Sequence, residues 1–240
     1  MTYKYLSLIL VANILIGCNS GKDNNTDNST YANVNVVGAM KNVMWNGELG
    51  GKIELDTIDK SGLYGLGPES YLSGEILIMD GTGYVSKVSS DSTMSVEKTF
   101  QTSAPFFVYA HVKEWEEVDL PASVKNIRDL ENFIDEKTKE AKRPFSFKLE
   151  GRATNAIIHI VNLPPGSVVS SPDEAHKGQI NYSLENEDVS ILGFFSTEHK
   201  AIFTHHDSFM HMHLISKDEM KMGHLDNLEI GRMKLYLPQK

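Results

Sequence analysis

Residues 209–224 read FMHMHLISKDEMKMGH, and this pattern decides how the rest of the chain is interpreted. The first seven of these residues, 209–215, predict a β-strand. Alternate residues of a strand share one face, so His211 and His213 point the same way, about two residue rises apart. Two imidazoles at that separation can converge on one metal ion.

His224 supplies a third imidazole. The polar segment 216–223 ends in a glycine and can return the chain, so that His224 arrives from a neighbouring strand. Three histidine ligands with an open fourth position form the arrangement of a catalytic zinc site, although imidazole also suits copper, nickel and iron. The alternative is that these histidines are ordinary residues of a β-strand and bind no metal.

The other histidines and the cysteine content narrow the choice of ligands. Six of the nine histidines lie between His199 and His224. His205 and His206 are adjacent, so an extended chain directs them to opposite sides, and we do not expect them to be ligands. Cys18 is the single cysteine, which excludes an intramolecular disulfide and a cysteine-rich metal site. A transition metal would therefore be bound by His, Asp or Glu.

Several segments upstream predict β-strands. Residues 75–79 and 83–88 flank Asp80-Gly81-Thr82, a hairpin signal in which Asp-Gly supplies the positive φ. Residues 99–112 predict a pair of strands or one long buried strand. Residues 145–149 and 156–161 predict two further strands, joined by a turn at Glu150-Gly151-Arg152.

Two segments predict helices. Residues 36–45 carry apolar side chains at helical spacing and stop at Asn46-Gly47. Residues 123–142 form the clearest helical pattern, with Ser123 as its cap and Pro144 after its end. Few helices among many strands predict an α+β fold, with mixed or antiparallel β-sheets in two fused β-rich subdomains.

The N-terminal residues predict export. Residues 6–16 are mostly apolar but too short to span a bilayer, and they lead into Leu15-Ile16-Gly17-Cys18, which resembles a bacterial lipobox. We therefore expect a lipoprotein signal peptide over residues 1–17 and lipidation of Cys18. Residues 18–34 are expected to be a flexible tether, followed by one domain over residues 35–240. The protein would then be exported and anchored by lipid to a bacterial membrane, on the periplasmic or cell-surface side.

The composition excludes one class of partner. The chain has 240 residues, 40% of them hydrophobic and 23% charged, which is enough for a sizeable core. The formal net charge is −9, and no cluster of Lys and Arg stands out. Binding to nucleic acid depends on such clusters, so we expect none.

The histidine segment resembles a known family. His211, His213, Asp218, Gly223 and His224 are similar in type and spacing to the HLHF…D…GGH segment of the alpha-acetolactate decarboxylases. Weaker matches follow in the family's order across residues 37–238. They are Gly65-Leu66-Gly67, Gly74-Glu75, Asp80-Gly81, Ala104-Pro105-Phe106, Phe145, Phe147, Lys148, Gly151, Gly193-Phe194 and Leu237-Pro238.

The resemblance implies a function. The family decarboxylates 2-acetolactate, a small 2-hydroxy-3-oxo acid, to acetoin. By resemblance, Zn²⁺ on the three histidines acts as a Lewis acid for an enediolate intermediate, and a nearby acid protonates one face. Glu75 occupies the position of an active-site glutamate. The resemblance also implies a homodimer.

Two positions depart from the family pattern in ways that concern catalysis. His159 stands where the family has an arginine that holds the substrate carboxylate, and Lys234 stands where it has a glutamate. Pro68 also replaces a threonine. An imidazole is not always charged and cannot form the arginine fork. We expect that His159 acts as a proton donor and that Lys234 supplies the missing cation.

Two further interpretations remain open. The protein could keep the zinc and the fold but bind another ligand, or act without catalysis as a zinc-binding or ligand-binding lipoprotein. A purely structural surface protein would explain the lipobox, but it would leave the histidine spacing without a reason.

Overall fold

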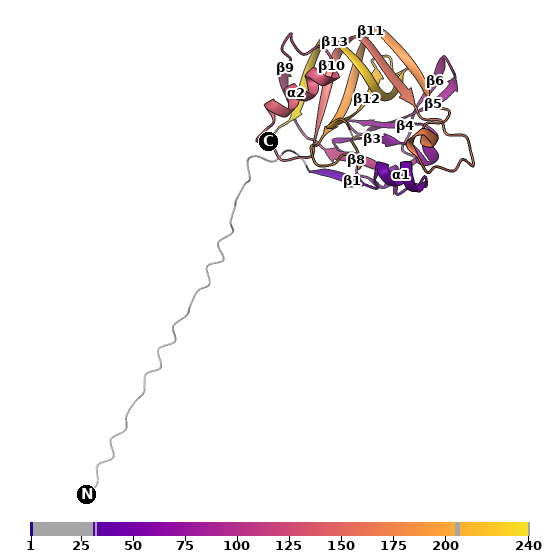
Figure 1. Ribbon diagram of the computed structural model, residues 1–240. Coiled ribbons are helices and arrows are strands. Elements are labelled where there is room, and N and C mark those ends of the chain that lie inside the picture. The colour runs from indigo at the N-terminus through magenta and orange to yellow at the C-terminus, as the bar shows by residue number, and fades with distance from the viewer. Residues whose placement is uncertain (2–30, 32, 205–206, 240) are drawn as a thin grey trace.

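The structure is a computed structural model that describes residues 1, 31, 33–204 and 207–239. The predictions for Cys18, His205 and His206 lie outside these described residues. Strands dominate the described chain and form two layers, with the short helices at their margins (Figure 1). Within the described residues, no helix is long and apolar enough to cross a membrane.

The first layer is a six-stranded antiparallel sheet. Its strands are β1 (Val34–Val37), β3 (Leu63–Pro68), β4 (Glu75–Met79), β5 (Thr82–Ser90), β6 (Thr93–Lys98) and β8 (Phe107–His111). They lie in the order β1-β8-β3-β4-β5-β6. The predicted hairpin is confirmed, because Asp80 and Gly81 join β4 to β5 with φ values of 47° and 72°. Positive φ at both positions matches the twist of the flanking strands.

The predicted strand segment 99–112 forms two short strands. β7 (Ser103–Ala104) pairs with β2 (Ile53–Glu54), whereas β8 pairs with β1 and β3. Pro105 separates the two strands, and a proline cannot donate a backbone hydrogen bond to a ladder.

The second layer closes on itself. It contains β9 (Trp115–Asp119), β10 (Phe145–Ile160), β11 (Ile180–Phe195), β12 (Met210–Ser216) and β13 (Met222–Pro238). The order is β10-β11-β12-β13-β9, and β10 also pairs with β13 along most of its length. The last four long strands thus form a barrel-like ring, and β9 adds to one end of β13.

The predicted turn at Glu150-Gly151-Arg152 is wrong, because β10 runs through it without interruption. Gly151 has a φ of 140°, and a Cβ there would lie 2.2 Å from the carbonyl oxygen of Arg232. The register against β13 shifts between Arg152 and Ala153. The glycine therefore serves a close strand approach at a bulge.

The helices are shorter than the sequence predicts. α1 (Met40–Asn46) begins after Gly38, because residues 34–37 pair with β8 as an edge strand. α2 (Ile127–Lys137) is capped by Asn126, whose side chain accepts from the Asp129 N–H at 3.0 Å, and Ser123 is not its cap. The remaining helical segments are α3 (Pro172–Ala175) and the 3₁₀ turns η1 (Leu55–Thr57) and η2 (Ser70–Leu72).

One apolar cluster joins the two layers. Leu77 and Val108 of the first sheet pack with Leu192, Phe194 and Ile215 of the second. A separate cluster, which includes Phe145 and Phe147, fills the ring of long strands. Every pairing between the named strands is antiparallel. The predicted α+β class with antiparallel β-rich parts is therefore confirmed.

Candidate metal centre

The structure brings His211, His213 and His224 together between the two layers. His213 of β12 is the register partner of His224 of β13. The ring centroids lie 5.1 Å apart for His211 and His213, 4.9 Å for His211 and His224, and 5.4 Å for His213 and His224. One ligand atom from each ring lies within 4.8 Å of the other two. The three rings can therefore share one ion after small side-chain rotations.

The alternation of β12 explains this placement. Met210, Met212 and Leu214 face the interior of the ring of strands. The opposite face carries His211, His213 and then Ile215, which packs against the first sheet. Both faces of β12 are buried, so the strand places two imidazoles out of contact with water.

Gly223 lets β13 approach closely beside His224. A Cβ at Gly223 would lie 2.5 Å from the carbonyl oxygen of His159 on β10. A larger residue would push the two strands apart, and the rings of His159 and His224 would separate with them. The glycine of the histidine segment is thus a packing requirement of the site.

His213 provides the test of whether these residues fit a metal. Its side chain is fully buried, and neither ring nitrogen meets hydrogen-bond geometry with any described residue. Burial and, to a smaller extent, the charge of His159 lower the pKa of His213, an interaction with the Ile76 backbone raises it, and the resulting pKa is about 3. The ring is therefore neutral at ordinary pH and keeps a lone pair to donate. A buried polar group without a partner is costly, and a metal ion would supply that partner.

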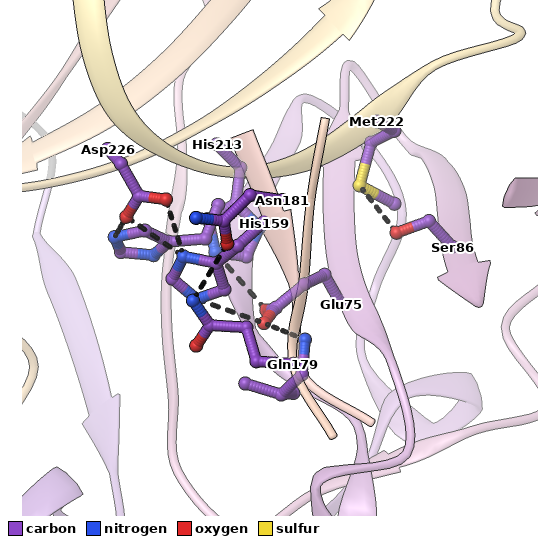
Figure 2. Close-up of polar contacts among 10 residues, drawn as sticks. Glu75, Ser86, His159, Gln179, Asn181, His213, Met222 and Asp226 are labelled. Carbon is purple, nitrogen blue, oxygen red and sulfur yellow. Dashed lines mark hydrogen bonds and ion pairs between the residues drawn. The ribbon is translucent and has the colours of Figure 1, made fainter. Parts of the chain in front are cut away.

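Glu75 faces the histidines from the first sheet. It is the first residue of β4 and only 3% exposed. One carboxylate oxygen lies 3.6 Å from His213 Nε2, and the other lies 3.9 Å from His159 Nε2 and accepts from the Val161 N–H at 3.4 Å (Figure 2). Burial raises the pKa of Glu75 well above its usual value; the Val161 N–H opposes this shift and the charge of Asp226 adds to it.

His159 joins the cluster from β10. It is the register partner of His224, and the two rings stack with centroids 4.6 Å apart at an angle of 26°. Its Nδ1 lies 2.8 Å from both carboxylate oxygens of Asp226. His159 therefore lies beside the candidate metal ligands, at the position where the family pattern has an arginine.

The structure does not bring Lys234 to the site. Its Nζ donates to Glu117 and Asp119, each at 2.7 Å, on the surface. Lys234 lies ten residues along β13 from His224, roughly 30 Å at the rise of an extended strand. The expectation that Lys234 supplies a cation beside the metal is corrected accordingly.

Asp226 is a site residue that the sequence analysis missed. It approaches both His159 and His224, the latter at 3.9 Å from Nε2, and groups with them as a second set of potential ligands. The sequence offers a weak signal only, because Asp226 follows His224 by two residues but lies at a register shift that interrupts the regular alternation of the strand.

The cavity beside the histidines is small. Its volume is about 30 Å³, room for about two water molecules. Met40 and Met44 of α1 form part of its wall, with Leu72 and Phe106. His176 also lines it, and its Nδ1 bonds to the Pro172 carbonyl at 2.7 Å. These residues come from separate elements, so no local sequence pattern linked them to the histidines.

The chain is similar to known proteins of one family. The family model for alpha-acetolactate decarboxylase matches residues 37–239. An alpha-acetolactate decarboxylase of Brevibacillus brevis is 24% identical over 195 residues, which are 81% of this chain and 66% of the relative, just under two thirds of its length.

Solved structures share the fold. Acetolactate decarboxylase from Bacillus subtilis subspecies spizizenii superposes with a TM-score of 0.70 at 22% identity, covering 86% of each chain. A Staphylococcus aureus protein of unknown function, similar to alpha-acetolactate decarboxylase, gives a TM-score of 0.68 at 15% identity, covering 86% of this chain and 85% of that one. Because the family model matches residues 37–239, which are most of this chain, the chain belongs to the alpha-acetolactate decarboxylase family.

Proposed function

We propose that this protein decarboxylates 2-acetolactate to acetoin, with His211, His213 and His224 holding a divalent metal ion, zinc in the first instance. The observation that carries the proposal is the buried set of three histidines facing Glu75, in a chain of this family. The neutral His213 ring and the set of three histidines suit a catalytic zinc ion, which takes three protein ligands and leaves a fourth position open. When bound, the ion supplies a Lewis acid for negative charge that develops on the substrate ketone as CO₂ leaves.

Glu75 would act on the substrate's oxygen atoms. Its carboxyl group lies 3.6 Å from His213 Nε2, so it can form a hydrogen bond with a substrate hydroxyl or ketone oxygen bound beside the histidines. Because Glu75 is buried, water does not compete for this hydrogen bond.

His159 would supply the proton. Loss of CO₂ leaves an electron pair on the carbon that carried the carboxylate, and a C–H bond forms there as an N–H bond of the imidazole breaks. One proton is taken up from solvent per turnover, because an anionic acid becomes neutral acetoin and CO₂. His159 cannot reproduce the arginine fork, so substrate binding depends more on the metal and on Glu75.

A second candidate function has an observation of its own. The cavity of about 30 Å³ is too small for a nine-heavy-atom substrate until side chains of α1 move. A protein that binds metal but takes a smaller ligand, or performs no catalysis, would suit the cavity as it stands. Met40 and Met44 are the side chains whose movement separates the two functions.

One experiment distinguishes these functions. The purified chain from residue 19 onward is analysed for bound metals, and racemic 2-acetolactate is supplied while acetoin is measured. Zinc together with acetoin supports the decarboxylase. Zinc without acetoin supports the binding protein, and the absence of any bound transition metal contradicts both.

We also propose that the protein is exported and anchored through Cys18. Support comes from the sequence pattern of residues 6–18. In a bacterial host, Cys18→Ser should release the protein from the membrane fraction and abolish labelling by a fatty-acid analogue. Labelling that persists in the variant would contradict the anchor.

A further inference from the structure

Asp226 occupies a β-bulge beside the candidate metal centre. Along β10 and β13, His159 pairs with His224, Ile158 with Leu225 and Ile157 with Asn227. Asp226 is therefore the extra residue at the register shift. Bulges commonly occur next to active sites, where they redirect a side chain. Here the redirected carboxylate meets His159.

The contact between Asp226 and His159 fixes one ring nitrogen. Nδ1 of His159 lies 2.8 Å from both carboxylate oxygens, and the imidazole is almost completely buried. A carboxylate accepts hydrogen bonds from the ring, so this contact places a hydrogen on Nδ1. Nε2 is then the nitrogen directed into the site, 3.9 Å from the Glu75 carboxylate (Figure 2). It delivers its proton from the imidazolium form, in which both ring nitrogens carry a hydrogen, and the ring is left as the Nδ1–H tautomer.

Asp226 also lies at a boundary between the site and the surface. About a third of its side chain is exposed, whereas His159 and Glu75 are 7% and 3% exposed. A second cavity of about 280 Å³ lies against Asp226 and His224. The carboxylate can therefore stay in contact with water while it binds a buried ring. This contact keeps the free-energy cost of desolvating the carboxylate low.

We infer that Asp226 is a positioning residue that holds His159 by Nδ1 and so presents Nε2 to the reacting carbon. The inference rests on the proposed decarboxylase function and deepens it. The positioning of His159 explains how an imidazole can deliver the proton at the position where relatives are expected to have an arginine. The ring is held in one tautomer and one orientation by a residue on the neighbouring strand, as second-layer carboxylates do at other sites. The face on which acetoin is protonated then depends on Asp226.

A different role for Asp226 makes a different prediction. The carboxylate also lies 3.9 Å from Nε2 of His224. If its main task were to support His224 as a ligand, its removal would lower the affinity for metal. If it positions His159, the metal content would stay unchanged while proton delivery suffers.

The test compares Asp226→Asn with Asp226→Glu, in the wild type and in a His159→Arg background. The matched control is Asp188→Asn, which removes an exposed carboxylate bonded to Arg152. The measurements are kcat, KM, bound metal and the enantiomer ratio of the acetoin. Ring ¹⁵N NMR of the metal-free protein reports the His159 tautomer.

We expect Asp226→Asn to lower kcat by about 10- to 100-fold, with KM and metal content nearly unchanged. The acetoin should become more racemic, because water then competes to deliver the proton. Asp226→Glu should recover part of kcat. In the His159→Arg background, the Asp226 substitution should add little, because its effect passes through the imidazole.

Several outcomes would overturn the inference. The first is that Asp226→Asn leaves both the enantiomer ratio and kcat unchanged, and the second is that it loses the bound metal. The third is that Asp226→Asn lowers kcat in the His159→Arg background as much as it does in the wild type. NMR separates this failure from failure of the proposed function. If the wild type makes no acetoin but His159 is held as the Nδ1–H tautomer only when Asp226 is present, the function is wrong and the positioning stands. If acetoin forms and the tautomer ignores Asp226, the positioning is wrong.

Discussion

His213 and His224 are register partners across β12 and β13, and their ring centroids lie 5.4 Å apart. The next strand places His159 opposite His224 on the other side of β13. Three neighbouring strands thus align four imidazoles, including that of His211, against Glu75 of the other layer. The strand register, rather than a loop, sets the geometry of the centre, so the site should be rigid.

Loss of one histidine should empty the metal centre. We expect His213→Ala to lose bound zinc after dialysis and to lose the rise in Tm that zinc gives the wild type, because ligand binding stabilises the folded state. Elemental analysis and thermal unfolding with and without zinc provide the measurements. His111→Ala is the control, since His111 bonds to the Asp59 carbonyl outside the cluster. Wild-type zinc content in His213→Ala would falsify the assignment.

Glu75→Ala should separate metal binding from catalysis. The substitution removes the hydrogen bond that Glu75 gives the substrate, so kcat should fall by at least about 100-fold. Zinc content should be retained. The control is Glu97→Ala on the exposed face of β6. A Glu75→Ala variant with the wild-type kcat would exclude a role of this carboxyl in the reaction.

Lys234→Met should leave decarboxylation unchanged. Its ammonium is held by Glu117 and Asp119 at the far end of β13. Exposed ion pairs of this kind also contribute little to stability. Steady-state assays of acetoin and thermal unfolding check both statements, with His159→Ala measured alongside as the variant expected to lose activity. A fall in kcat for Lys234→Met would mean that the tertiary placement of β13 is misread.

Gly193→Ala should destabilise the fold. A Cβ there would lie 2.2 Å from the ring of Phe147, which is fully buried inside the ring of strands. Overpacking of this kind costs about 1–3 kcal/mol in the free energy of unfolding. Urea denaturation measures the difference. Gly50→Ala is the matched control, because nothing lies within 4 Å of its added Cβ, and equal stability of the two variants would contradict the packing argument.

Stability should fall at alkaline pH partly through Tyr84. Burial, followed by the hydrogen bond and charge of Glu219, raises the pKa of Tyr84 to about 12. An unfolded tyrosine titrates near about 10. The folded state therefore binds more protons between these values, so this contribution is complete below pH 10 and is lost as pH rises toward 12.

Tyr84→Phe should accordingly show a shallower loss of stability over that pH window. Urea midpoints measured from pH 9 to pH 12 give the comparison. Tyr71→Phe serves as the control, because Tyr71 is 66% exposed. Identical pH slopes for wild type and Tyr84→Phe would rule out the contribution.

Local patterns predicted those elements whose geometry is set by neighbouring residues. Asp80-Gly81 forms the expected turn because positive φ is an intrinsic preference of that pair. The turn predicted at Gly151 is wrong, because a glycine with positive φ can also occupy a bulge in a continuous strand. The predicted helix over residues 36–45 is wrong at residues 36 and 37, because the edge of β8 offers them backbone hydrogen bonds. Such tertiary partners override local periodicity.

The amino-acid order was enough to identify the three histidines and Glu75 as candidates, since strand alternation and the family pattern can both be recognised along the chain. The residues that surround them became known from the folded structure alone. Lys234 and His224 share one strand, yet they lie at opposite ends of it. Asp226 meets His159 across 67 residues because a bulge in β13 redirects one side chain. Contacts of this kind depend on which strands pair, and residues so far apart in the sequence meet only once those strands lie side by side.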